Sequence, residues 1–206
     1  RGLGILEAFA GGKPVMTNQE LARHTRLPKP TVTRLTQTLT ALGYLEAAPD
    51  SSGFYLAPRL AAIGAAVLNG SGIAKVCRPL MQQAADELVA EVGLASRDGM
   101  SVVYLENCRT AKEIQLHIVP GTRLPIEIIA IGHAYVAGMP GADRETLLET
   151  IKLRHGRSWH QIYSNVQSSL KQVARQGFCV ADGWAVKLRS AAVPLVLPGA
   201  QAPYAL

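Results

Sequence analysis

Two prolines fix where a helix can begin in the segment 27–43. Pro28 and Pro30 are separated by one residue, and because proline donates no backbone hydrogen bond, both fit only in the first turn of a helix. The segment therefore predicts a helix that starts at about Lys29 and ends at Gly43. Its apolar residues recur at spacings that gather them into one buried stripe, which consists of Val32, Leu35, Leu39 and Leu42.

A shorter helix precedes this one. Thr17 and Glu20 have the spacing of a capping box, in which a hydroxyl and a carboxylate satisfy backbone N–H groups at a helix start. The helix should carry Leu21 inward, and residues 25–27 should form the turn to the next helix. Two helices joined by so short a turn predict a helix-turn-helix.

The outward face of the second helix carries hydroxyl, amide and cationic groups. Between residues 17 and 42 there are four Lys or Arg residues against the single acid Glu20. Such groups suit phosphates at a helix start and base edges along the helix, so we predict a DNA-binding face made of Lys29, Thr31, Thr33, Arg34 and Gln37. The alternative is a plain helical bundle with threonines on its solvent face, which helix stability alone explains poorly because threonine is a mediocre helix former.

The flanking segments fit a small domain around these helices. Residues 44–46 and 54–56 read as strands on either side of a turn, which predicts a wing. A first helix over 1–9 should pack Leu3, Leu6 and Phe9 against the pair. An alanine-rich helix over 60–68 then runs into the polar, glycine-containing segment 69–72, which predicts a linker.

The composition of the chain excludes several classes of protein. With 206 residues, 48% of them hydrophobic, the chain can form two small cores. The three cysteines have no paired spacing, so no disulfide framework and no zinc or other metal site is expected. No apolar run approaches the roughly 20 residues of a membrane helix, and without a signal peptide we expect a cytoplasmic protein. The chain stops within a predicted strand, so we expect the natural C-terminus to lie further on.

The second half of the sequence predicts helices packed on an antiparallel sheet. An amphipathic helix over 73–92, closed by Gly93, should bury a stripe of Ile73, Val76, Cys77, Leu80, Met81, Ala84, Leu88 and Val92. It leads to a hairpin that turns at Asp98–Gly99. A strand over 114–118 follows, with His117 solvated. Two further helices are expected, one capped by Asp143 and one ended by Gly177, and then a central strand over 191–197. This order predicts an α+β domain.

The segment 124–138 reads as a loop that feeds a short apolar helix. A helix start presents unpaired N–H groups, which favour a carboxylate guest. The alternative is that Ile126, Ile128, Ile129 and Ile131 form core and that these N–H groups are capped internally.

Several motifs together resemble one family. They are 27–35 (LPKPTVTRL), 39–46 (LTALGYLE), 54–64 (FYLAPRLAAIG), 121–125 (GTRLP), 130–134 (AIGHA) and 177–182 (GFCVAD). In this order, over nearly the whole chain, they resemble the IclR family of bacterial transcriptional regulators. The resemblance implies a winged helix-turn-helix domain (1–58), a linker helix and hinge (59–72) and a GAF-like effector-binding domain (73–206). It also implies dimers or tetramers, with the linker helix and first helix in the dimer contact.

The same resemblance implies an effector pocket for a small organic acid. Its residues would be Ile129, Ala130, Ile131 and Gly132, with Asp182 near the family's pocket aspartate and Ser190 where many members have a cysteine. Asp182 as a plain turn residue is the alternative. The family has small or hydroxyl residues where this chain has Ile128 and Ile129, so we expect a more apolar pocket that favours an aromatic acid.

The function that follows is ligand-responsive regulation of transcription at a double-stranded operator. No nucleophile elbow, glycine-rich phosphate loop or HExxH motif occurs, so neither an enzyme nor a cofactor is expected. The alternative is a ligand-sensing module without a regulatory role, whose basic helix contacts a protein. Ionic strength separates the two, because phosphate contacts weaken steeply with salt.

Overall fold

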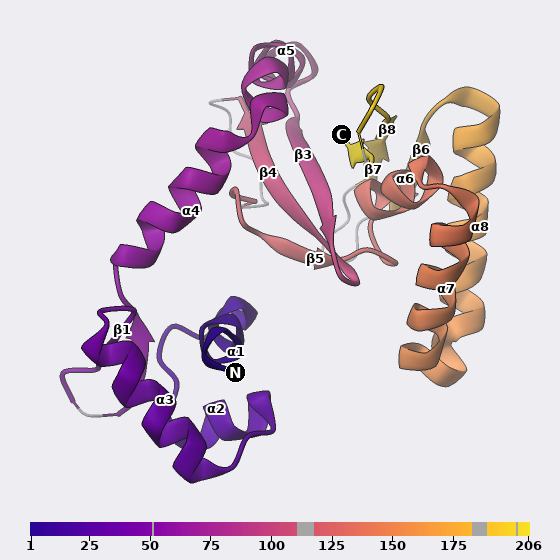
Figure 1. Ribbon diagram of the computed structural model, residues 1–206. Coiled ribbons are helices and arrows are strands. Elements are labelled where there is room, and N and C mark those ends of the chain that lie inside the picture. The colour runs from indigo at the N-terminus through magenta and orange to yellow at the C-terminus, as the bar shows by residue number, and fades with distance from the viewer. Residues whose placement is uncertain (51, 111–117, 183–188, 201) are drawn as a thin grey trace. The chain divides into compact units, whose positions relative to one another are not determined.

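The computed structural model describes residues 1–50, 52–110, 118–182, 189–200 and 202–206. They form two compact units, Arg1–Asn69 and Gly70–Leu206, whose elements are labelled in Figure 1. Within the described residues, no single helix is long and apolar enough to cross a membrane. The helices α4 (Arg59–Gly70) and α5 (Gly72–Leu88) reach that length and composition only when taken together. The predicted strand over 114–118, with His117, falls largely on residues 111–117, outside the described ranges.

The first unit is a winged helix-turn-helix. Its elements in order are α1 (Gly2–Glu7), η1 (Ala8–Gly11), α2 (Asn18–Thr25), α3 (Lys29–Ala41), β1 (Leu45–Ala47), β2 (Phe54–Leu56) and α4 (Arg59–Gly70). The capping box forms as predicted, with Thr17 accepting from the Glu20 N–H and the Glu20 carboxylate accepting from the Thr17 N–H. The predicted start of α3 at Lys29 is also confirmed, and β1 pairs antiparallel with β2 to make the wing.

The predicted apolar stripe of α3 is partly wrong. Leu42 is 52% exposed, because it lies at the C-cap, just before the chain turns away through Gly43 with φ +72°. Thr36 is fully buried instead. Its hydroxyl lies 3.0 Å from the Thr33 carbonyl and 3.1 Å from Asn18 Oδ1, and these contacts allow a polar side chain to enter the core. In the first helix Ile5 is buried and Leu3 is exposed, the reverse of the prediction for Leu3.

The second unit is the predicted α+β domain. Its elements are α5 (Gly72–Leu88), β3 (Glu91–Asp98), β4 (Ser101–Arg109), β5 (Arg123–Pro125), α6 (Ala130–Gly138), α7 (Gly141–His155), η2 (Gly156–Ser158), α8 (Trp159–Gln176), β6 (Cys179–Asp182), β7 (Arg189–Ala192), β8 (Pro194–Leu195) and β9 (Tyr204–Ala205). An antiparallel sheet has the order β5-β4-β3-β9-β8, and β6 and β7 form a separate hairpin. The main core joins the sheet to α6, α7 and α8.

Several boundaries in this unit differ from the prediction. Helix α5 ends at Leu88, where Val89 adopts a left-handed conformation with φ +51°, so residues 91–98 are free to form a strand. The expected stripe of α5 is wrong at Val76, Leu80 and Leu88, which are exposed, while Ala74, Met81 and Ala85 are buried. Only Ser71 separates α4 from α5, so most of the predicted linker segment is helical.

Two further corrections concern the last elements. The predicted central strand over 191–197 is wrong, because the chain breaks at Val193 into β7 and β8, and β8 is an edge strand. Asp143 lies in the first turn of α7 rather than at its N-cap, which is Pro140. Gly177, in contrast, ends α8 with φ +86°, as predicted.

Helix α6 is buried along seven consecutive residues. It packs so closely on the loop before it that a Cβ at Gly132 would lie 2.0 Å from the carbonyl oxygen of Ile126. Because backbone atoms cannot yield as a side chain can, this position admits only glycine. The loop and α6 therefore act as one rigid piece of the core.

We predict that Gly132→Ala destabilises the second unit by about 1–3 kcal/mol through this overlap. The measurement is the midpoint of thermal unfolding followed by circular dichroism. Gly141→Ala is the matched control, since a Cβ there meets no atom within 4 Å. Equal midpoints for the two variants would contradict the close approach.

Candidate functional site

All five residues predicted to contact DNA lie on α3. Lys29, Arg34 and Gln37 are exposed, and Thr31 and Thr33 are half-buried. Lys29, Thr33 and Gln37 are spaced by four residues and so follow one another along a single face. Arg34 extends that face sideways, away from the buried Val32 and Leu39. The helix thus presents a continuous polar strip to solvent.

The start of α3 is suited to bind an anion. Its N-cap, Pro28, makes no side-chain hydrogen bond, and Pro30 has no N–H group. The N–H groups of Lys29 and Thr31 therefore remain at the positive end of the helix dipole, beside the Lys29 ammonium. A phosphate oxygen is the natural partner for this arrangement.

The threonine hydroxyls of α3 also have a structural role. Thr33 Oγ1 donates to the Lys29 carbonyl at 3.1 Å, and Thr38 Oγ1 donates to the Arg34 carbonyl at 2.9 Å. These bonds satisfy the hydroxyl protons inside the helix. The oxygen lone pairs stay available, so a threonine here can still accept a hydrogen bond from a base amino group.

The acid near α3 is held in an ion pair, and the nearby cations, across the described part of the chain, are not. The Lys13 ammonium donates to the Glu20 carboxylate, and this bond, followed by those from Thr17, lowers the pKa of Glu20 to about 2. The single acid of residues 17–42 is thereby paired. Arg23, Arg26, Lys29 and Arg34 remain, and within the described residues none of them forms an ion pair.

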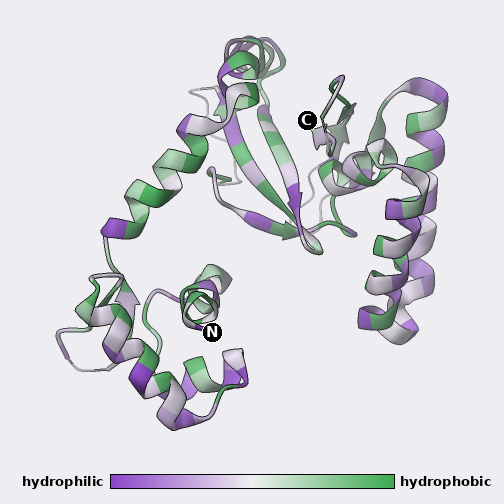
Figure 2. Ribbon diagram, viewed as in Figure 1, coloured by the Kyte–Doolittle hydropathy of each residue, from purple (hydrophilic) through white to green (hydrophobic). Residues whose placement is uncertain are grey.

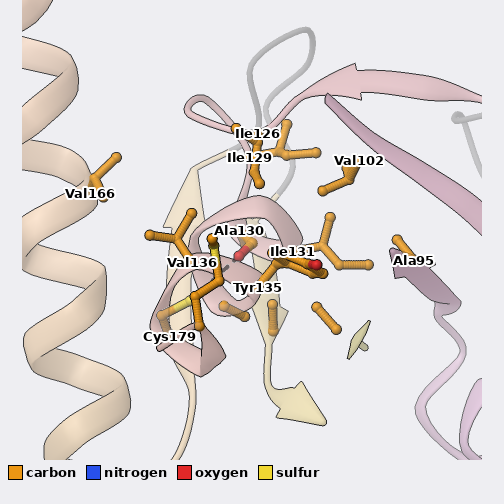
Figure 3. Packing of buried hydrophobic residues seen from close by; sticks show 14 of the residues in the cluster. Ala95, Val102, Ile126, Ile129, Ala130, Ile131, Tyr135, Val136, Val166 and Cys179 are labelled. Atoms are coloured by element: carbon orange, nitrogen blue, oxygen red, sulfur yellow. Dashed lines mark hydrogen bonds between the residues drawn. The ribbon is translucent and has the colours of Figure 1, made fainter. Parts of the chain in front are cut away.

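The predicted effector segment forms the first turn of α6. The side chains of Ile129, Ala130 and Ile131 are buried between the sheet and α8, as the close-up in Figure 3 shows. The isoleucines are therefore core, as the alternative interpretation had it. The internal cap of that interpretation stays a prediction: Ile129 makes no side-chain cap, and no hydrogen bond among the described residues reaches the N–H groups of 130–132. Among the residues that the structure describes, the first turn of α6 is thus a buried positive end without a cap.

A buried polar network supports α6 from the side of α7 and α8. His133 Nε2 lies 2.9 Å from the Glu127 carbonyl, which can only accept, so Nε2 carries the proton. Ser169 Oγ then donates to His133 Nδ1 at 2.8 Å. Burial lowers the pKa of His133, which keeps the ring neutral. Glu127 Oε1 accepts from His155 Nε2 at 2.6 Å.

Sequence reasoning missed this network. The signal was present: Glu127 is the only acid in the apolar run 126–131. An acid so placed needs a donor in the folded chain, and that donor lies 28 residues away. Periodicity along one helix does not reveal so distant a partner.

Asp182 and Ser190 lie on the β6–β7 hairpin. The Asp182 side chain is 88% exposed and lies 3.5 Å from the Arg189 guanidinium, and Ser190 is also exposed. The base of the same hairpin reaches α6, because Cys179 Sγ donates to the Ala130 carbonyl at 3.5 Å. The structure thus brings Cys179, rather than Asp182 or Ser190, to the first turn of α6.

The described residues give little support for a metal site or for a reactive cysteine. No group of three or more His, Cys, Asp or Glu side chains there could hold a metal ion. Burial raises the pKa of the Cys108 and Cys179 thiols, which disfavours the reactive thiolate.

Comparisons with known proteins agree with this architecture. Residues 1–49 match the IclR helix-turn-helix domain, and residues 65–206 match the C-terminal domain of the bacterial transcriptional regulator IclR. The HTH-type transcriptional regulator TsaQ1/TsaQ2 of Comamonas testosteroni is 32% identical over 207 residues, which is 99% of this chain and 74% of that protein.

Solved structures have the same fold. An IclR family transcriptional regulator from Brucella abortus is 35% identical with a TM-score of 0.89, over 99% of this chain and 77% of that one. An IclR homolog from Microbacterium hydrocarbonoxydans, solved in complex with 4-hydroxybenzoate, has a TM-score of 0.72 at 21% identity, over 99% of this chain and 85% of that one. The chain therefore belongs to the IclR family of bacterial transcriptional regulators.

Proposed function

We propose that this chain regulates transcription by binding operator DNA through the polar face of α3, under the control of a small organic acid bound at the start of α6. The observation that carries the DNA half is α3 itself. It combines an uncapped positive end with an exposed face of cationic, amide and hydroxyl groups. Lys29 and the first N–H groups hold a phosphate, while Thr33, Arg34 and Gln37 reach base edges in the major groove.

Two copies of the chain are part of this proposal. Helix α4 is apolar along most of its length, as the green ribbon in Figure 2 shows, yet it buries no residue. Ile63 and Val67 are 50% and 62% exposed. A second copy that covers this helix would remove its apolar surface from water. Such a homodimer would place two α3 helices in successive major grooves of a pseudo-palindromic operator.

The effector half rests on the chemistry of α6. Its uncapped N–H groups favour a carboxylate, and the surrounding isoleucines favour an apolar or aromatic body. The Microbacterium protein, solved with 4-hydroxybenzoate, is similar in fold, and a ligand of that kind meets both requirements. Asp182 and Ser190 stay predicted pocket residues, which would require the exposed hairpin to close on the ligand. Regulation then requires that the acid bind the two arrangements of the dimer with different affinity.

We predict that Arg34→Ala weakens binding to a selected operator duplex by about 1–3 kcal/mol, roughly 5- to 150-fold, because a base contact is lost. Thr33→Ala should weaken operator binding less. Lys29→Ala should reduce the slope of log affinity against log salt concentration by about the amount expected for one lost phosphate contact. The measurement is fluorescence anisotropy at several salt concentrations.

Thr38→Ala is the control for these variants. It removes the same kind of hydroxyl-to-carbonyl bond from an exposed site in the last turn of α3, and it should bind as the wild type does. Wild-type affinity for both Arg34→Ala and Thr33→Ala would show that the DNA-binding face lies elsewhere. Binding that is insensitive to salt would favour a protein partner instead.

We predict that 4-hydroxybenzoate or benzoate raises the thermal midpoint of the wild-type protein and that Ile129→Asp removes this response. An aspartate at the N-cap occupies the N–H groups that the ligand carboxylate would bind. At 100 times its dissociation constant, a ligand should stabilise the wild type by about 2.7 kcal/mol.

Ile129→Val is the control, since it keeps the shape of the site and supplies no cap. Cooperative thermal unfolding of Ile129→Asp without ligand, followed by circular dichroism, checks that the second unit is folded. If the ligand still raises the thermal midpoint of this folded variant, the acid site does not lie at the start of α6. Substitutions at Gly132 are unsuitable for this test, because they disturb the backbone contact with Ile126.

A further inference from the structure

The turn between α2 and α3 is closed by an arginine in a left-handed conformation. Arg26, the C-cap of α2, has φ +56° and ψ +24°. A residue with a Cβ atom adopts this conformation at a cost in free energy, whereas glycine adopts it freely. Glycine is also the usual residue where a helix ends in this way. The fold of the turn alone would therefore be better served by glycine.

The residues beside Arg26 hold this turn in place. Thr25 Oγ1 donates to the Leu21 carbonyl at 2.6 Å, and the Leu27 N–H donates to Thr25 Oγ1 at 3.4 Å. Leu27 also packs on the apolar core of the first unit. All of these contacts belong to the neighbours of Arg26, so none of them requires an arginine at this position.

The Arg26 side chain is exposed and, among the residues that the structure describes, forms no ion pair. Arg23 in the last turn of α2 and Lys29 at the start of α3 are exposed as well. The three cations are spaced by three residues, so they follow one another along the chain from α2, across the turn, to the predicted DNA-binding face. The acid that precedes them, Glu20, is already bonded to Lys13.

An exposed arginine in this place suits the phosphate backbone of DNA. Its guanidinium can donate two parallel hydrogen bonds to phosphate oxygens. Contacts of this kind fix a protein on the duplex beside the helix that reads the bases, and Arg26 directly precedes that helix in the chain. An arginine where the backbone favours glycine is then explained by binding rather than by folding.

We propose that Arg26 anchors the chain on a phosphate of the operator, separate from the phosphate held by Lys29. The proposal rests on the DNA binding proposed above and adds the turn before α3 to the interface. Because the contact is made with the backbone, it adds affinity for any duplex without reading the sequence. In this respect Arg26 differs from Arg34, which reaches base edges.

The test compares Arg26→Gly with the wild-type chain by fluorescence anisotropy at several salt concentrations, on the operator duplex and on a duplex of scrambled sequence. One lost phosphate contact reduces the slope of log affinity against log salt concentration by about 0.9, which corresponds to about an eightfold loss of affinity for each protomer at about 0.1 M salt. The loss should be equal on both duplexes and should shrink as the salt concentration rises. The thermal midpoint of Arg26→Gly should equal or exceed that of the wild type, because glycine relieves the backbone strain.

Two further variants separate the charge from the backbone strain. Arg26→Lys keeps the charge and should keep most of the affinity and the salt slope of the wild type. Val89→Gly relieves a left-handed residue of the second unit, with φ +51°, and removes no charge. It should bind both duplexes as the wild type does.

The outcomes that contradict the proposal are distinct. If Arg26→Gly has the affinity and salt slope of the wild type while Lys29→Ala and Arg34→Ala bind more weakly, Arg26 is no anchor and the proposed function stands. A loss confined to the operator duplex would assign Arg26 to a base and not to a phosphate. A lowered thermal midpoint of Arg26→Gly would show that the arginine serves the fold. A wild-type chain that binds neither duplex would overturn the anchor and the proposed function together.

Discussion

The approach of the Ile126 carbonyl to Gly132 is the constraint on which the second unit depends. It sets α6 directly on the loop that follows β5 and leaves no room for any side chain. The first turn of α6 is consequently buried together with its N–H groups, which have no partner among the described residues. Hydrogen bonds from His133 to the Glu127 carbonyl and from Cys179 to the Ala130 carbonyl hold the same loop and turn from two other sides. A positive helix end is thus kept in a buried setting of low dielectric constant, where its interaction with an anion is strong.

The first unit fixes its functional helix by similar means. The capping box at Thr17 sets the start of α2, and the buried hydroxyl of Thr36 meets Asn18 in the first turn of that helix. This contact ties α2 to α3 directly beside the predicted DNA-binding face, because Thr36 lies one and two turns after Thr33 and Lys29 on the helix. The orientation of Arg34 and Gln37 therefore depends on a polar contact in the core as well as on the apolar stripe. In each unit, hydrogen bonds between polar atoms orient the functional helix, α3 in the first and α6 in the second. Hydrophobic packing supplies most of the stability.

Local chemistry in the sequence predicts local structure well in this chain. Pro28 and Pro30 locate the start of α3, and Thr17 with Glu20 locates that of α2. Prediction fails where the answer depends on distant contacts. The stripe of α5 is misassigned because the periodicity of a largely apolar helix does not say which side meets the sheet, and residues 191–197 look like one strand although they serve two sheets. The buried carboxylate of Glu127 has its partner His155 28 residues away, so no local pattern in the sequence predicts this contact.

The acid site proposed at the start of α6 offers N–H donors and a positive dipole end. It favours an anion and repels a cation, because the dipole end carries a partial positive charge. Ala130 belongs to the core that joins α6 to the sheet. Because that core is closely packed, a ligand at this site can act on the rest of the unit only through a shift of α6 against the sheet.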